Sequence, residues 1–112
     1  MKSIGAQYDP VKQALLKITD NVGKGEAIDA TRSHIVYMFD SEGESLHADN
    51  VKASQVLQGS IDLFALPEDE AMFDQVQQAL NEAEISFYFS SAQFEDLELN
   101  DFTHYEWIFE VS

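Results

Sequence analysis

Cysteine is absent from this 112-residue sequence, and glycine and proline are scarce, at five and two residues. Without cysteine the chain can form no disulfide and offers no thiolate as nucleophile or metal ligand. Five glycines leave little material for a phosphate-binding loop. No apolar run reaches the roughly 18–20 residues that a membrane-spanning helix needs. The opening stretch MKSIGAQYDP lacks the apolar core of a secretory signal. We therefore expect synthesis in the cytoplasm and no membrane partner.

Basic residues are also few. Six Lys and Arg stand against 21 Asp and Glu, which gives a formal charge of −15. All six bases lie within residues 1–52, together with eight acids, whereas residues 53–112 contain 13 acids and neither Lys nor Arg. Such a surface repels phosphate backbones, which argues against ordinary nucleic-acid binding. Three uses remain open: a well-solvated surface, a docking face for a basic partner, or a surface along which DNA slides without adhering.

Apolar residues are nevertheless plentiful, at 45% of the chain, with 12% aromatic. This content is too high for a disordered acidic tail, and the length suits a single core, so we predict one domain over residues 1–112. The stretch FTHYEWIFEVS (102–112) alternates as a half-buried strand does. Its apolar side, which includes the only Trp, comprises Thr103, Tyr105, Trp107, Phe109 and Val111.

Two helices are expected. In the first, Asp9 is placed as the N-cap, Pro10 at the first helical position and Gly23 as the stop. The second spans 66–84, with Pro67 at its start and three acids in the first turn, where the helix dipole favours negative charge. Its buried stripe is expected to comprise Met72, Phe73, Val76, Ala79, Leu80 and Ala83.

Four strands are expected, at 34–39, 55–66, 85–90 (with a possible extension toward 101) and 102–112. Residues 40–54 hold only two large apolar residues and are expected to form a long, mobile connection. The sequence therefore predicts an α+β fold of order α-β-β-α-β-β. It consists of an antiparallel four-stranded sheet with two helices packed on one face.

Catalytic and metal chemistry find little support. His47 with Asp49, and His104 with Glu106, are candidate ligand pairs, but two ligands do not make a site. The acid clusters at 68–70 and 95–98 are explained by a helix N-terminus and a hairpin tip. We see no nucleophile motif. We therefore predict a non-enzymatic protein with no catalytic, metal-binding or cofactor-binding residues and no cofactor.

The ordered pattern resembles the tail terminator (tail-completion, head–tail joining) family of long-tailed bacteriophages. The likeness covers residues 34–112 well and 9–33 loosely, although family members tend to carry Lys or Arg in and after the second helix and this chain has none there. The stretches that carry it are HIVYMF (34–39), a loop ending ADN (48–50), QGSIDLF (58–64), DEAMFDQVQQALNEA (69–83), ISFYFSSAQFEDLE (85–98) and FTHYEWIFEVS (102–112).

The resemblance implies a structural virion protein made in the host cytoplasm. It would form a ring of copies, expected to be a hexamer, that caps the tail tube and stops tube polymerisation. Its partners would be the tube protein and the head–tail connector, with DNA passing through the lumen without specific binding. Contacts to neighbouring subunits or to the tube are then expected in the long connection, at Leu46, His47, Asp49, Asn50 and Val51.

A second class of function remains open. Small, very acidic domains without cysteine can mimic double-stranded DNA and occupy the basic surface of a DNA-handling protein. Duplex DNA carries about one negative charge per 1.7 Å of its axis, so a mimic must hold its carboxylates in ordered rows. Residues 53–112 supply 13 acids, enough for a short stretch. Many of them fall at expected caps, turns and alternating strand positions, where solubility alone accounts for them.

Overall fold

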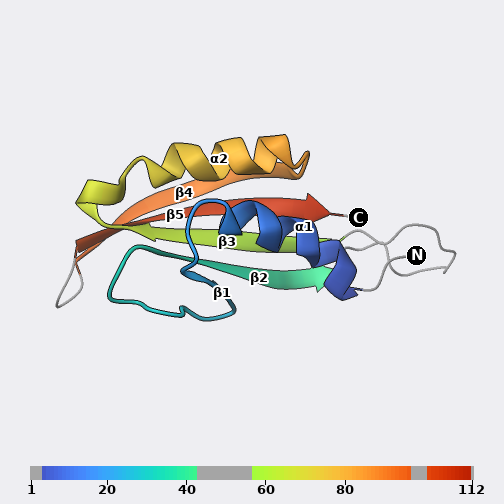
Figure 1. Ribbon diagram of the computed structural model, residues 1–112, viewed down its shortest axis with the longest axis horizontal. Helices are drawn as coiled ribbons and strands as arrows, with labels where there is room; N and C mark the ends of the chain where they lie inside the picture. The colour runs from blue at the N-terminus through green and yellow to red at the C-terminus, as the bar shows by residue number, and fades with distance from the viewer. Residues whose placement is uncertain (1–3, 43–56, 97–100, 112) are drawn as a thin grey trace, which may run out of the picture.

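The computed structural model describes residues 4–42, 57–96 and 101–111 of the chain (Figure 1). Within these ranges no helix is long and apolar enough to cross a bilayer. The elements, in chain order, are α1 (Ile4–Leu16), β1 (Val22–Lys24), β2 (His34–Glu42), β3 (Leu57–Ala65), the 3-10 helix η2 (Pro67–Asp69), α2 (Met72–Glu82), β4 (Ser86–Asp96) and β5 (Asp101–Val111).

The sheet has five strands in the order β1-β2-β3-β5-β4. β1 pairs with β2 in parallel, and the other three pairings are antiparallel. The prediction of an antiparallel four-stranded sheet is therefore wrong: the sheet is mixed and has one more strand. β5 lies between β3 and β4, so a strand late in the sequence occupies the middle of the sheet.

β1 falls where the sequence predicted the end of the first helix. α1 instead ends at Leu16, and the chain tightens there as the N–H of Ile18 donates to the carbonyl of Leu15 at 3.0 Å. Pro10 lies inside α1 rather than at its first position. A three-residue strand shows no usable alternation, and Val22 continued the apolar helical spacing, so sequence pattern alone favoured a longer helix.

The buried side chain of Asn21 holds β1 and its following loop in place. Its amide nitrogen donates to the carbonyls of Asp29, at 3.0 Å, and Ser33, at 2.9 Å, and its carbonyl oxygen accepts the N–H of Asp29 at 3.0 Å. Asn21 is only 1% exposed, and a buried amide is tolerated when its hydrogen bonds are made. The loop from β1 to β2 is thereby folded back on its own start.

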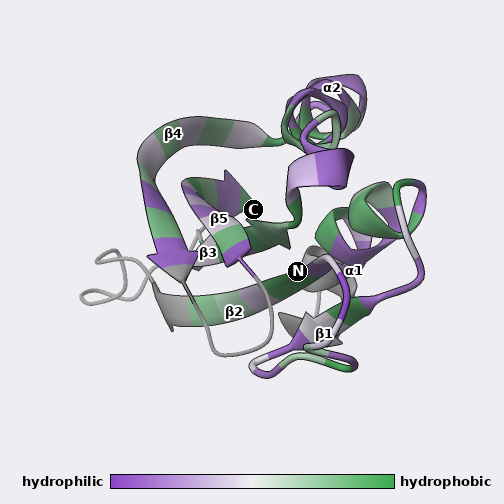
Figure 2. Cartoon of the chain, turned by 90° about the vertical axis from the view of Figure 1, so that its left-hand side faces the viewer, coloured by the Kyte–Doolittle hydropathy of each residue, from purple (hydrophilic) through white to green (hydrophobic). Residues whose placement is uncertain are grey.

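Both helices lie on the same side of the sheet (Figure 2), and the core fills the space between them and the strands. Trp107 and Phe109 of β5 are fully buried there, as the alternation of the last strand predicted. The indole N–H of Trp107 donates to the side-chain oxygen of Gln77 on α2 at 3.0 Å. The ring of Phe73 lies 5.3 Å from the Trp107 ring, centroid to centroid. α2 thus packs on the face of β5 that carries Trp107 and Phe109.

Gly59 marks a close approach between strands. A Cβ at Gly59 would overlap the carbonyl oxygen of Met38 and would lie 2.6 Å from the ring of Phe109. The register of β2 shifts between Phe39 and Ser41, directly opposite this position. The missing side chain therefore lets β2 and the Phe109 ring approach the same point of β3.

Replacing Trp107 by Ala should lower the free energy of unfolding by about 3–5 kcal/mol, because it empties the centre of the core. Urea denaturation followed by circular dichroism measures the loss. Phe94→Ala is a matched control: Phe94 is 67% exposed in the neighbouring strand, so its loss should change stability by no more than about 0.5 kcal/mol. Equal effects of the two substitutions would show that β5 is not part of the core.

Candidate interaction surface

The sheet face away from the helices is partly open and carries most of the polar strand residues. The strand register places the side chains of Asp62, His104 and Glu106 on this face, together with Tyr88 and Ile108. Near the start of β2 the face is closed by aromatic rings: Phe64 stacks between His34, at 4.7 Å, and His104, at 4.1 Å, between ring centroids.

His104 is held between two carboxylates from the two neighbouring strands. Its Nε2 lies 2.8 Å from Oδ1 of Asp62 on β3, and its Nδ1 lies 3.2 Å from Oε2 of Glu95 on β4. Glu106 follows on the same face of β5 and pairs in register with Asp62. A protonated imidazole here donates to both carboxylates and offsets their mutual repulsion.

Two opposing influences set the pKa of His104: burial of the ring and the two neighbouring carboxylates. Burial is the largest single influence and lowers the pKa, because the charged ring loses water. The hydrogen bonds that the ring donates to Asp62 and Glu95, with the negative charges of these carboxylates, outweigh burial, so the pKa of His104 is raised above its ordinary value. The charged form of this histidine therefore ties together the three strands β3, β5 and β4.

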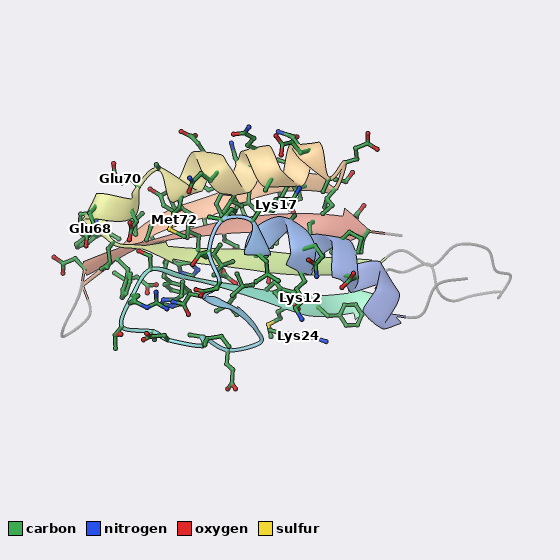
Figure 3. The ribbon with its side chains drawn as sticks, in the orientation of Figure 1. Lys12, Lys17, Lys24, Glu68, Glu70 and Met72 are labelled. Atoms are coloured by element: carbon green, nitrogen blue, oxygen red, sulfur yellow. The ribbon has the colours of Figure 1, made fainter. Side chains whose placement is uncertain are left out.

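Three lysines lie apart from the acids around η2, whereas Arg32 lies beside an acid of its own loop. Figure 3 shows Lys12 on α1, Lys17 just after it and Lys24 at the end of β1, whereas Glu68 and Glu70 lie away from them at one end, in and just after η2. In the loop after β1, Arg32 forms an ion pair with Asp29, Nε to Oδ2, at 3.0 Å.

Asp29 is the acidic partner of a local loop contact. Hydrogen bonds from the side chain and backbone of Thr31, and from Arg32, lower the pKa of Asp29 to about 2. This carboxylate therefore stays charged and keeps the Arg32 guanidinium within its own loop.

β4 forms one edge of the sheet and is the most exposed strand of the described residues. Tyr88 is 61% exposed, Phe89 42% and Phe94 67%. The strand runs for 11 residues, and its register against β5 shifts between Phe89 and Ser91. Because an edge strand leaves every second N–H and C=O unpaired by its own sheet, β4 presents backbone hydrogen-bonding groups beside these aromatic rings.

The described surface is hollowed in several places. One, of 230 Å³, is lined by Ser86, Phe87 and Tyr88 of β4 and by Ile108 and Glu110 of β5. It combines apolar walls with a carboxylate at the sheet edge.

A second hollow, of 510 Å³, lies between the end of α1, η2 and α2, and its lining includes Ser33 and Asp69. There the hydroxyl of Ser33 donates to Oδ2 of Asp69 at 2.6 Å and accepts the N–H of Leu66 at 2.9 Å. These contacts connect the start of β2 to the segment that follows β3. The Ser33 hydroxyl both donates and accepts a hydrogen bond within the fold.

The structure does not test the predicted interface residues. Leu46, His47, Asp49, Asn50 and Val51 fall outside the described residues. Of the ligand pairs considered from sequence, His104 is placed with Asp62 and Glu95, and the described ranges hold no cluster of three His, Asp or Glu side chains arranged for a metal ion. Sequence reasoning missed the β4 edge, although SFYFSSAQF, rich in aromatics and without Lys or Pro, contains its signal.

Comparisons with known proteins give no family. No family model matches the chain, and no curated protein does either. Among solved structures, one chain whose name states no function aligns over 93% of this chain and 94% of its own length, at 9% identity and a TM-score of 0.44. A likeness of that degree carries no argument about family or function.

The stability that His104 contributes should fall with rising pH. Because its pKa is raised in the folded state, the contribution is fully present below the unfolded-state value of about 6.5 and is lost as pH rises through the folded-state pKa. Urea unfolding of the wild type and of His104→Gln, from pH 5.5 to 8.5, measures it as the difference between the two proteins. That difference should shrink as pH rises. A difference independent of pH would show that the imidazole charge does not support the sheet.

Proposed function

We propose that this chain is a structural, non-enzymatic protein of the tail terminator kind. In this function, copies of the chain assemble as a ring on the finished end of a phage tail tube. The ring stops tube polymerisation and presents a face to the head–tail connector, and DNA passes through its lumen.

The observation that carries the proposal is the order of the resembling stretches on the fold. HIVYMF lies in β2, QGSIDLF in β3, and the stretch 69–83 contains α2. The stretch 85–98 contains β4, and FTHYEWIFEVS runs along β5. Each of these five stretches therefore matches one element, and together they make up the strands β2, β3, β5 and β4 and the helix α2, whereas the loop ending ADN (48–50) lies outside the described residues.

The charge distribution supports the same function. Residues 53–112, which include β3, α2, β4 and β5, carry 13 acids and no base. Two unit charges 10 Å apart in water repel by only about 0.4 kcal/mol, and salt screens this further. Summed around a lumen, many such repulsions would keep a phosphate backbone from adhering to the wall as it slides.

Assembly state is the first test of this proposal. Native mass spectrometry and negative-stain electron microscopy of the full chain, over protein concentrations from about 10 μM to 1 mM, should show closed rings with a central opening or their subassemblies. Adding tubes of the tail tube protein encoded in the same genome should place a cap on tube ends. Tubes grown with the chain present should be shorter than tubes grown without it.

A chain that stays monomeric and leaves tube length unchanged would contradict the proposal. The DNA-mimic alternative makes the opposite forecast: the monomer should bind a basic DNA-handling protein, compete with duplex DNA for it and lose affinity steeply as salt rises. Titrating the same sample with such a protein at 50 and 200 mM salt therefore separates the two functions.

A further inference from the structure

We propose that the edge of β4 that no described strand covers binds an extended, basic segment of another protein, which adds to the described sheet as a sixth strand. The inference concerns this surface alone and does not require that the chain form rings. It rests on three properties of β4: its position in the sheet, its exposed aromatic rings and the sign of the charge around it.

β4 has the backbone geometry that strand addition needs. It is the terminal strand of the described sheet, and its 11 residues exceed the length of most strands. Soluble proteins usually protect such an edge with Lys, Pro, a bulge or a very short strand; β4 contains neither Lys nor Pro, and its one bulge lies between Phe89 and Ser91. The register shift at Phe89 and Ser91 divides it into two regular segments, 86–89 and 91–96. Either segment can hydrogen-bond to an added strand.

Exposed rings flank this edge on both faces of the sheet. The register puts Tyr88, 61% exposed, on the open face, and Phe89 and Phe94 on the face that carries the helices. Neighbouring strands lie about 4.8 Å apart, so side chains of an added strand would cover these rings. The segment that binds therefore carries apolar residues at alternating positions.

The charge around the edge selects a cationic partner. β4 and the elements that pack beside it, α2 and β5, contain no Lys or Arg. Glu82 and Glu84 lie exposed just before β4, and Glu110 lies exposed on the neighbouring β5. A second copy of this chain, with formal charge −15, would bring the same sign of charge to the edge. A strand with Lys or Arg brings the opposite sign.

The 230 Å³ hollow beside the edge gives one basic side chain a specific place. Its lining combines the faces of Tyr88 and Ile108 with the carboxylate of Glu110. An Arg or Lys stem can lie along the two apolar side chains while its charged end reaches Glu110, and the Tyr88 ring favours a cation over its face. We therefore place one Arg or Lys of the partner strand opposite the 86–89 segment.

The test uses the full chain, labelled with ¹⁵N, and a synthetic peptide of nine residues. The peptide alternates Val and Thr, with Arg at its centre and Lys at both ends. We expect amide exchange to slow by about tenfold or more at every second residue of 86–89 or 91–95, and nowhere else to a similar degree. A counterpart with Glu in place of Arg and Lys should leave the exchange of β4 unchanged.

Two forms of the peptide that keep its charge separate strand addition from simple attraction. One form is N-methylated at the odd-numbered residues and the other at the even-numbered residues. Because alternate N–H groups of a strand point to opposite edges, only one form lacks the N–H groups that face β4. One form should bind and the other should lose binding. If both bind as well as the parent peptide, or if no β4 amide is protected at 1 mM peptide, the inference is overturned. Protection of β4 that grows with protein concentration in the absence of peptide would show a second copy at this edge and would equally overturn it.

Variants locate the basic side chain. Glu110→Gln and Tyr88→Ser should each lower the affinity for the peptide by about fivefold. Glu26→Gln is the control: it removes the same charge near the opposite edge of the sheet and should lower the affinity by less than about twofold. All three residues are exposed, so the variants are expected to fold. Equal losses for Glu110→Gln and Glu26→Gln would overturn the assignment of the hollow and indicate general attraction to an acidic protein.

Discussion

The burial of one face of the β3–β5 pair is the constraint on which the rest of the fold depends. Trp107 and Phe109 on β5, and Ile61 and Leu63 on β3, are fully buried beneath the helices. Each side chain of this size is worth about 1.5–3 kcal/mol when removed from water, so these four make a large contribution to the core. α2 packs on the buried face of these two strands, and β4 pairs with β5 on the side away from β3. The position of α2 and the place of β4 at the sheet edge both follow from the burial of this face of β3 and β5.

Alternating apolar residues made β5 predictable, and the apolar stripe of α2 was equally plain in the sequence. Val76, Ala79 and Leu80 of that stripe are buried. β1 was not predictable, because three residues show no period. Its place depends on Asn21, whose partners Asp29 and Ser33 lie eight and 12 residues further on. The interaction surface was partly visible in the absence of Lys and Pro from residues 86–96. The hollow on this surface, however, is formed by residues of both β4 and β5. No local sequence pattern specifies that these two strands pair.

The negative charge has two opposed consequences for assembly. It keeps copies of the chain apart, since like charges repel, and it attracts cationic segments to the same surface. A ring of such subunits must therefore be held by apolar contacts, by screening or by a basic partner that offsets the charge. His104 solves the same problem inside one subunit, where a single imidazole lies between Asp62 and Glu95. Local neutralisation of carboxylates thus operates within the sheet, and the proposed ring would require it again between copies of the chain.

The central position of β5 also has a consequence for the growing chain on the ribosome. Leu57 of β3 pairs with Val111 of β5 and Ala65 with Thr103, so the middle of the sheet joins residues that lie 38 to 54 positions apart in the chain. At about 5–20 residues per second, β3 waits roughly 3–10 s for its partner. During that interval its apolar face and one edge are open to other nascent chains. Translation speed and chaperone access over this stretch therefore bear directly on how much of the protein reaches its native state.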